Sequence, residues 1–445
     1  MPHTYLLFGD NIWESKAVME KIREHCLTDE LFSKIELGGC PALPIYTLHH
    51  KDIVFQVECR GNYNQWNDLP SKVHKYISFF DKPDAVLFDE ENNKIIAAGE
   101  FTETVSVGNS QWQRSGRAVA SAKLDVPFLA VYPCVAEDRS QDTLREPTAL
   151  LTEFFLKLSL EDLDSPTLLL LREDPYLYEY NIERRKIGLP VLNKPEGDYY
   201  IGRWFGLRLL SSKDKSMRKY LIKLEREIYT QMFHTLYEHV LYYGKETTRV
   251  EKDLPLWGSK FENPTDIASI RKHTLRELSG IIWLGIQGKQ ASNSYFNKVV
   301  CPQLLSKTTP KTYVRGGKHC IISSDFTKET EKILLEKYPP HEGHKWKLGK
   351  LNYSLPTSLI PLQVWQRDGE AYSDPNAGEA VAFPAMFDSL DKKQTNIIFI
   401  AYGKPSINWY SDFSRGGRKV WRAMKKLGDI LCVDNDNDPI SISLR

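Results

Sequence analysis

Two acidic residues, Asp84 and Glu100, are the side chains whose type and spacing best suit chemistry in this sequence. They stand at the two ends of a segment in which two short apolar runs, 85–88 and 94–98, flank the polar residues 89–93. This pattern predicts a β-hairpin whose open end carries both carboxylates. Two adjacent carboxylates are stable when a cation lies between them, and their oxygens suit Mg²⁺. Phosphodiester hydrolysis is a reaction that such a site supports.

The segments around the hairpin predict the elements that must position these carboxylates. Residues 72–80 are expected to form a helix before the hairpin. Residues 111–124 have the small side chains of a helix packed on a sheet, and residues 126–132 are an apolar run typical of a buried strand. The predicted order is therefore helix, hairpin, helix and strand.

This order and its motifs resemble the PD-(D/E)XK, or restriction-endonuclease-like, nuclease superfamily. The resemblance covers residues 70–135 and depends on Pro83-Asp84 and on Glu100-Phe101-Thr102. It implies a mixed sheet flanked by helices. It also implies that Asp84, Glu100 and the carbonyl oxygen of Phe101 bind Mg²⁺.

Thr102 departs from the family pattern, because it stands where the motif has a lysine that orients the attacking water. Thr102 shares a strand face with Glu100 and can hydrogen-bond a water molecule, but it cannot carry a positive charge. We therefore treat Thr102 and Gln113 as catalytic candidates, with Arg114 and Arg117 as further groups near the start of the following helix. Gln113 is alternatively a surface amide. The two arginines either contact DNA phosphates or lie on a solvated face.

The net charge of +1 excludes a uniformly basic nucleic-acid binder, so any DNA contact must be local. One basic stretch, residues 415–426, places Lys and Arg around Trp421 and two glycines. It is either a solvated helix face or a contact with the DNA backbone. Its candidate DNA-binding residues are Arg415, Arg418, Lys419 and Arg422.

The chain of 445 residues is long enough for two or three domains. We predict an α/β protein with a nuclease-like core in residues 1–145. Residues 146–345 are expected to be mainly helical and to serve DNA recognition or dimerisation. Residues 346–445 are expected to form a mixed α/β region with a basic helix for DNA contact.

Several classes of protein lack support in the sequence. The seven cysteines form no Cys-x-x-Cys pair, so we expect them to be reduced and buried. Phosphate-binding and dinucleotide-binding glycine motifs are missing, so no nucleotide cofactor is expected. No apolar run approaches twenty residues, and residues 1–10 do not resemble a signal peptide. We expect a cytoplasmic protein without a membrane contact.

These observations predict an Mg²⁺-dependent DNA endonuclease, best matched by a sequence-specific type II restriction enzyme that acts on double-stranded DNA. Because each core cuts one strand, a homodimer is expected. Two alternatives stay open. One is a catalytically inactive nuclease fold that serves as a DNA-binding or scaffold subunit, which Thr102 favours. The other is a phage-defence nuclease that cuts only when triggered.

Overall fold

The structure is a computed structural model of the chain. It describes residues 2–63, 69–102, 112–138, 143–145, 149–161, 165–186, 188, 191–243, 312–315, 319–322, 324–365, 374–387, 393, 395–403, 405, 408–434 and 439–445. The chain divides into two compact units, and each is described by itself. The first comprises Met1–Gly108, Arg117–His239 and Leu256–Arg271, and the second comprises Asn109–Gly116, Val240–Pro255 and Lys272–Arg445.

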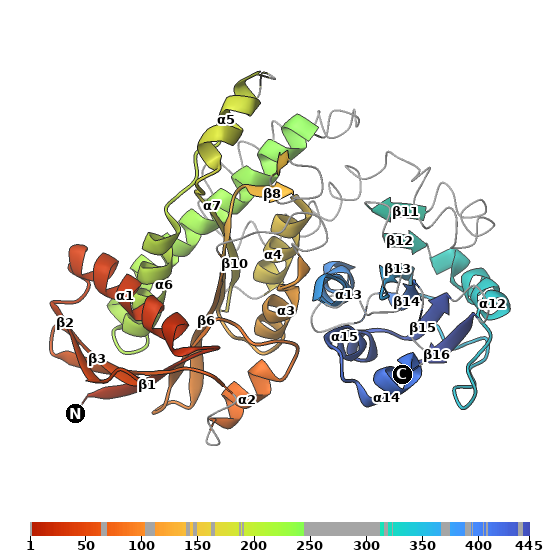
Figure 1. The fold of residues 1–445 in the computed structure, drawn as a ribbon, viewed down its shortest axis with the longest axis horizontal. Coiled ribbons are helices and arrows are strands. Elements are labelled where there is room, and N and C mark those ends of the chain that lie inside the picture. Colours follow the sequence, from red (N-terminus) through yellow and green to blue (C-terminus); the bar gives the residue numbers. More distant parts are fainter. Residues whose placement is uncertain are drawn as a thin grey trace. The chain divides into compact units, whose positions relative to one another are not determined.

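A mixed eight-stranded sheet forms the centre of the first unit (Figure 1). Its strands lie in the order β10-β7-β6-β5-β1-β4-β3-β2. The pairs β1–β4, β6–β7 and β7–β10 are parallel, and the remaining neighbours are antiparallel. The strands are β1 (His3–Gly9), β2 (Lys34–Cys40), β3 (Leu43–His50), β4 (Ile53–Arg60), β5 (Ala85–Asp89), β6 (Lys94–Phe101), β7 (Phe128–Pro133) and β10 (Thr167–Arg172). A separate small hairpin joins β8 (Ala136–Asp138) to β9 (Thr143–Arg145).

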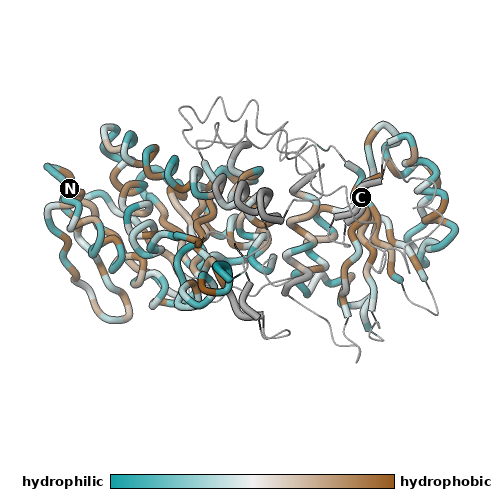
Figure 2. Tube along the Cα trace, turned by 90° about the horizontal axis from the view of Figure 1, so that it is seen from above, coloured by the Kyte–Doolittle hydropathy of each residue, from teal (hydrophilic) through white to brown (hydrophobic). Residues whose placement is uncertain are grey.

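The burial of these strands follows their sequences. Strands β5, β7 and most of β10 are buried at every described position, as expected for apolar runs covered on both faces. In β3, buried residues alternate with half-buried ones, so one face of that strand is less covered. Figure 2 shows the same distribution, with hydrophobic residues concentrated along the central strands.

Helices flank the first sheet, and two of them approach each other closely. A Cβ atom at Gly202 would lie 2.2 Å from the carbonyl oxygen of Lys21, and one at Gly206 would lie 2.5 Å from Sγ of Cys26. These glycines therefore allow α6 to pack directly on α1. The helices of this unit include α1 (Ile12–Thr28), α2 (Ser71–Ile77), α3 (Ser115–Lys123), α4 (Ala149–Glu161), α5 (Leu177–Lys186), α6 (Gly197–Ser211) and α7 (Arg218–Tyr243), with a short 3₁₀ turn η2 (Lys215–Met217).

The second unit is built on a six-stranded sheet in the order β11-β12-β13-β14-β15-β16. Its central strands β13, β14 and β15 are parallel and apolar, and its outer pairs are antiparallel. Its elements are β11 (Thr312–Arg315), β12 (His319–Ile322), η3 (Ser324–Phe326), α12 (Thr327–Lys337), β13 (Thr357–Gln363), α13 (Asp374–Phe387), β14 (Asn396–Tyr402), α14 (Trp409–Arg415), α15 (Lys419–Leu427), β15 (Ile430–Asp434) and β16 (Ile440–Ser443). The ring of Trp112 packs edge-on against Phe383 at 5.5 Å within this unit.

The predicted α/β class with a large mixed sheet flanked by helices is confirmed. The predicted hairpin is also confirmed, since β5 and β6 pair antiparallel, and α3 and β7 follow in the expected order. The start predicted for the helix at residue 111 is wrong, because α3 begins at Ser115 after a turn at residues 112–114. The basic stretch 415–426 is not one helix, since Gly416 adopts a left-handed conformation with φ of 65° and ends α14.

The predicted boundaries at residues 145 and 345 do not coincide with a division between compact units. Strand β10 lies beyond residue 145 but pairs with β7 of the first sheet, and β12 lies before residue 345 but pairs with β13 of the second. Long-range strand pairing of this kind leaves no local signal in the sequence. The roles predicted for the three regions stay predictions. The cysteine prediction needs one correction, because Cys40 is exposed on β2.

Candidate active site

The ends of several strands meet at one edge of the first sheet. Strand β5 runs antiparallel to both β1 and β6, so its beginning lies beside their ends. Asp84 directly precedes β5, Glu100 is the next-to-last residue of β6, and Ala85 pairs with Gly99. The hairpin register therefore places the two predicted carboxylates at neighbouring positions of the sheet edge.

The backbone of β6 fixes the carboxylate of Asp84. Its Oδ2 atom accepts a hydrogen bond of 2.7 Å from the backbone N–H of Phe101. The preceding residue is also held, because the hydroxyl of the buried Tyr63 donates to the carbonyl oxygen of Pro83 at 2.9 Å. Burial, the neighbouring Tyr76 and the negative charge of Asp84 raise the pKa of Tyr63 well above its usual value, so its hydroxyl stays protonated as a donor.

Glu100 is 1% exposed and pairs with the half-buried Arg117. Nη1 of Arg117 donates to Oε1 of Glu100, and Nη2 of Arg117 lies 3.5 Å from Oδ2 of Asp81. Burial by itself lowers the pKa of Arg117, but the carboxylates of Glu100, Asp81 and Asp84 outweigh burial and raise it. Arg117 is therefore a permanently charged guanidinium that faces three carboxylates.

Helix α3 holds Arg117 in place through a short chain of hydrogen bonds. The hydroxyl of Ser121, one helical turn further along α3, donates to the carbonyl oxygen of Arg117 at 2.8 Å. The hydroxyls of Ser121 and Tyr76 lie 2.6 Å apart, which ties α3 to α2. Arg117 therefore lies within the carboxylate cluster and not on a solvated helix face.

The start of α1 adds two further acidic residues to this edge. Asn11 caps α1, and Oε2 of Glu14 accepts hydrogen bonds from the backbone N–H groups of Asp10 and Asn11, which completes a capping box. Burial and the nearby charges of Asp84 and Asp10 raise the pKa of Glu14. Sequence reasoning missed Asp10, Glu14 and Asp81 as parts of the site. The available signal was the Asn-x-x-Glu capping pattern directly after an apolar strand.

The two predicted catalytic residues Thr102 and Gln113 belong to different units of the chain. Thr102 follows β6, is 6% exposed, and donates its backbone N–H to the carbonyl oxygen of Val131 at 3.2 Å. Gln113 and Arg114 precede α3 in the segment Asn109–Gly116, which belongs to the second unit. Their predicted roles, and a phosphate contact by either Arg114 or Arg117, stay predictions.

The four C-terminal basic candidates lie on the second unit around the break between α14 and α15. Arg415 ends α14, and Lys419 begins α15. Nη2 of Arg418 lies 3.6 Å from Oδ2 of Asp412, and Nη1 of Arg422 donates to the carbonyl oxygen of Gly417 at 3.1 Å. The three arginines are exposed and Lys419 is half-buried. This placement is compatible with DNA contact, which stays a prediction.

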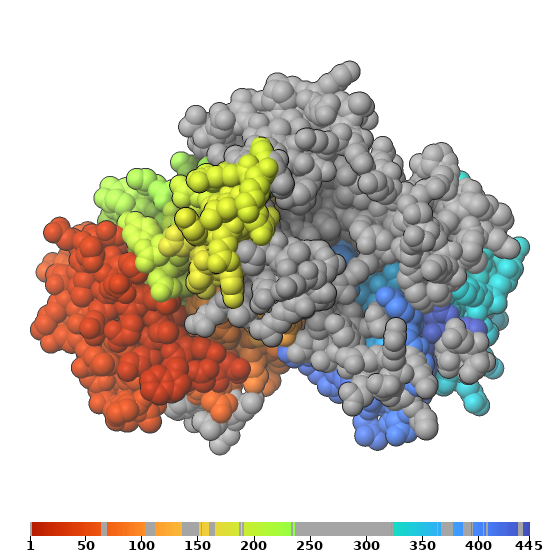
Figure 3. Space-filling view, turned by 45° about the horizontal axis from the view of Figure 1, so that its top comes forward, coloured from red at the N-terminus to blue at the C-terminus, as the bar shows by residue number. Residues whose placement is uncertain are grey.

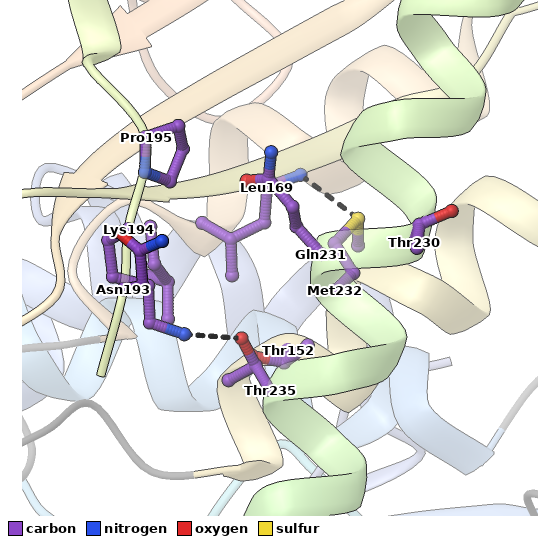
Figure 4. A pocket seen from close by; sticks show the side chains of 10 residues that line it. Thr152, Leu169, Asn193, Lys194, Pro195, Thr230, Gln231, Met232 and Thr235 are labelled. Carbon is purple, nitrogen blue, oxygen red and sulfur yellow. Dashed lines mark hydrogen bonds between the residues drawn. The ribbon is translucent and has the colours of Figure 1, made fainter. Parts of the chain in front are cut away.

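A separate cavity of about 260 Å³ lies in the first unit between β10, α4 and α7. Figure 4 shows the ammonium group of Lys194 directed at the hydroxyl of Thr235, with an Nζ–Oγ1 distance of 3.2 Å. Beside it, the backbone N–H of Leu169 donates to Sδ of Met232 at 3.5 Å. The cavity is lined by Thr152, Leu169, Leu171, Asn193, Lys194, Pro195, Thr230, Gln231, Met232 and Thr235. It is distinct from the carboxylate cluster.

The donor chemistry at the sheet edge suits a hard divalent cation. Asp84, Glu100 and the carbonyl group of Phe101 supply oxygen atoms alone, which is the ligand type that Mg²⁺ prefers. In the described ranges, no three His, Cys, Asp or Glu side chains have the arrangement of a complete metal-binding group. Arg117 is the cation that the structure places beside Glu100.

No protein-family model, curated protein or solved structure matches this chain. Of the helices that the structure describes, none has both the length and the apolar character needed to cross a bilayer.

Proposed function

We propose that the protein is an Mg²⁺-dependent DNA endonuclease whose active site is the carboxylate cluster around Asp84 and Glu100. The observation that carries this proposal is their position at adjacent strand ends, next to a third carboxylate and a charged arginine. An excess of carboxylates over cations at a partly buried edge favours binding of a divalent cation.

Four residues of the cluster have proposed roles. Asp84, Glu100 and the carbonyl group of Phe101 would hold Mg²⁺. When bound, the ion lowers the pKa of a water molecule and neutralises charge on the scissile phosphate. The backbone N–H of Phe101 orients Asp84. Arg117 supplies the positive charge that the missing motif lysine would provide, because its guanidinium stabilises negative charge that develops on the phosphate.

The more specific proposal is a type II restriction endonuclease that cleaves double-stranded DNA as a homodimer. In that case Arg415, Arg418, Lys419 and Arg422 would contact the DNA backbone, since exposed basic side chains position a protein on phosphates without reading sequence. Arg114 would contact a DNA phosphate in the same way, and Gln113 stays a catalytic candidate.

One observation favours a second candidate, an inactive nuclease fold that binds DNA as a scaffold. Arg117 pairs directly with Glu100, so this carboxylate already has a counter-ion, and Thr102 cannot replace the motif lysine. Under this alternative the ion pair is permanent and stabilises the fold without chemistry.

Cleavage of phage λ DNA separates these candidates. We would incubate the DNA and Mg²⁺ with the wild-type protein, with Glu100→Ala and with Glu24→Ala, whose exposed carboxylate on α1 lies outside the cluster. Discrete fragments that disappear only with Glu100→Ala would support a site-specific nuclease that uses this cluster. We expect cleavage by Glu100→Ala to be lost, because one metal ligand is removed.

Other outcomes would change the proposal. Cleavage that survives Glu100→Ala would move the catalytic centre elsewhere. A smear of fragments, or cleavage that requires an added phage component, would favour a triggered defence nuclease. Binding of DNA without cleavage by any variant would favour the scaffold protein.

A further inference from the structure

The cavity between β10, α4 and α7 has both polar and apolar walls and a mouth at the surface. Thr152, Leu169 and Leu171 are buried at its floor, whereas Asn193 is exposed at its rim (Figure 4). The rim segment follows α5, whose yellow surface is visible in Figure 3. A volume of about 260 Å³ is several times the roughly 30 Å³ that one water molecule occupies. The cavity is therefore large enough for a small organic ligand.

Strand β10 is the outermost strand of its sheet, so only one of its edges pairs with another strand. The carbonyl oxygens of Pro166 and Arg172 accept hydrogen bonds of 2.9 Å from residues at or next to the two ends of β7. Successive residues of a strand direct their backbone groups to opposite edges. Leu169 and Leu171 therefore direct theirs away from β7, toward the free edge, where a further strand can pair.

The cavity lies where this free edge has a gap. The backbone N–H of Leu169 donates to Sδ of Met232 at 3.5 Å, and the N–H of Glu173 donates to the carbonyl oxygen of Pro195 at 2.9 Å. Met232 and Pro195 both line the cavity. Between these two bonds, the carbonyl oxygen of Leu169 and the N–H of Leu171 have no hydrogen-bond partner in the part of the chain that the structure describes. Backbone groups at a covered edge require partners, which a ligand can supply.

A lysine stands beside this gap. Nζ of Lys194 donates to Oγ1 of Thr235 at 3.2 Å (Figure 4). The segment that carries Lys194 is held in place, because the side-chain amide of Asn181 forms hydrogen bonds of 2.7 and 3.0 Å with the backbone of Leu192. The ten residues that line the cavity include this one cation and no carboxylate. The lining therefore favours a ligand with a negative charge.

We propose that this cavity binds an N-acylated amino acid, which is the chemistry of the carboxyl-terminal residue of a peptide. The amide N–H of the ligand donates to the carbonyl oxygen of Leu169, and its carboxylate accepts from the N–H of Leu171. One residue of a parallel strand forms the same two bonds with the residues on either side of the one that it faces. The ammonium group of Lys194 balances the charge of the carboxylate. The ligand side chain packs on the apolar part of the lining.

This site is independent of the proposed nuclease activity, because ligand binding is measured without DNA or Mg²⁺. The probe is N-acetyl-leucine, which has the amide, the carboxylate and an apolar side chain. A ligand of this size binds weakly, so we expect a dissociation constant on the order of 1 mM. Titration of the full chain, followed by saturation-transfer NMR of the ligand, covers this range.

Two analogues test the proposed contacts on the wild-type protein, so they do not depend on the folding of any variant. N-acetyl-leucinamide replaces the carboxylate by a neutral amide and should bind about tenfold more weakly. N-acetyl-N-methyl-leucine keeps the carboxylate but cannot donate to Leu169, and its binding should also weaken several-fold. Equal binding of the acid and the amide would overturn the proposed role of Lys194. Equal binding of the methylated acid would overturn the pairing with the edge of β10.

A substitution locates the binding in this cavity. Lys194→Met removes the charge but keeps an apolar side chain of similar length, so the preference for the acid over the amide should disappear. Lys219→Met removes an exposed lysine of α7 that does not line the cavity, and it should leave this preference unchanged. Lys194→Met protein that keeps the preference, or wild-type protein that binds none of the probes, would overturn the proposal.

The length of the ligand distinguishes its two sources. N-acetyl-Ala-Ala-Leu has the same carboxyl-terminal residue and two more residues that can continue along the edge of β10. Binding at least about tenfold tighter than that of N-acetyl-leucine would support the proposal with a peptide terminus as the ligand. Equal binding of the two probes would support it with a free acylated amino acid.

Discussion

Two buried glutamates, one in each unit, have different partners for their carboxyl groups. Glu331 on α12 of the second unit is fully buried and accepts hydrogen bonds from the backbone N–H of Gly349 at 2.9 Å and of Leu351 at 3.0 Å. The hydroxyl of Tyr353 donates a third, at 2.5 Å. Glu100 of the first unit pairs with the guanidinium of Arg117, which also faces Asp81 and Asp84.

The difference separates a structural carboxyl group from a candidate functional one. Neutral donors of a single loop hold Glu331, so its interactions add to the stability of that loop. Glu100 belongs to a group in which three carboxylates face one guanidinium, and like charges in a partly buried group raise the free energy of the fold unless a cation joins them. Excess negative charge of this kind is maintained at a cost to stability and is typical of functional sites.

The largest effect is expected from replacing the shared cation of the first unit. Arg117→Met leaves Glu100, Asp81 and Asp84 without their guanidinium and should lower the free energy of unfolding by about 4 kcal/mol. Millimolar Mg²⁺ should restore much of this loss, because it replaces the missing positive charge. Denaturant-induced unfolding with and without Mg²⁺ measures both effects.

Arg208→Met is the matched control for that experiment. Arg208 is a half-buried arginine of the same unit, and its Nη2 lies 2.5 Å from Oε1 of the buried Glu225. This substitution removes a comparable ion pair but leaves one carboxylate instead of three. Equal rescue of both variants by Mg²⁺ would show that the cluster around Glu100 has no particular affinity for a divalent cation.

A smaller effect should distinguish the two glutamates directly. Glu331→Ala leaves three donors without their acceptor and should cost about 3 kcal/mol. Glu100→Ala should cost less, because one acceptor of Arg117 is removed while Asp81 and Asp84 stay as its counter-ions. Hydrogen exchange followed by mass spectrometry measures the two losses in the unit where each occurs. A loss at Glu100 as large as that at Glu331 would contradict the comparison and make Glu100 a structural residue.

The smallest effect concerns Glu14, whose pKa is raised by burial and by the charges of Asp84 and Asp10. A carboxyl group with a raised pKa binds its proton more tightly in the folded state. The folded state therefore loses stability as the pH rises from the unfolded pKa through the folded one. Glu14→Gln removes this loss but keeps the capping box, since glutamine also serves at this position.

We expect Glu14→Gln to be more stable than wild type at pH 7 by about 0.5 kcal/mol. The difference should vanish near pH 4, where wild-type Glu14 becomes protonated. Thermal unfolding of both proteins over this pH range measures it. A Glu14→Gln protein that is less stable than wild type at pH 7 would contradict this expectation. It would show that the ionised Glu14 stabilises the folded state.

Local sequence was sufficient to predict the hairpin and its two carboxylates. Apolar runs on either side of residues 89–93 specify two strands and a turn, and this geometry alone places Asp84 beside Glu100. The capping box of α1 and the buried strand β7 have equally local signals. These features depend on contacts between residues close in sequence, so side-chain pattern and turn chemistry determine them.

Only the tertiary structure decided what surrounds those carboxylates. The pairing of Arg117 with Glu100 and Asp81, and the approach of Glu14 to Asp84, depend on the order of the strands and on the face of each helix that turns inward. The assignment of residues 109–116 to the second unit has no local pattern either. Packing between distant segments sets these contacts. The total surface that each unit buries, rather than any short stretch of sequence, selects one arrangement of strands and helices.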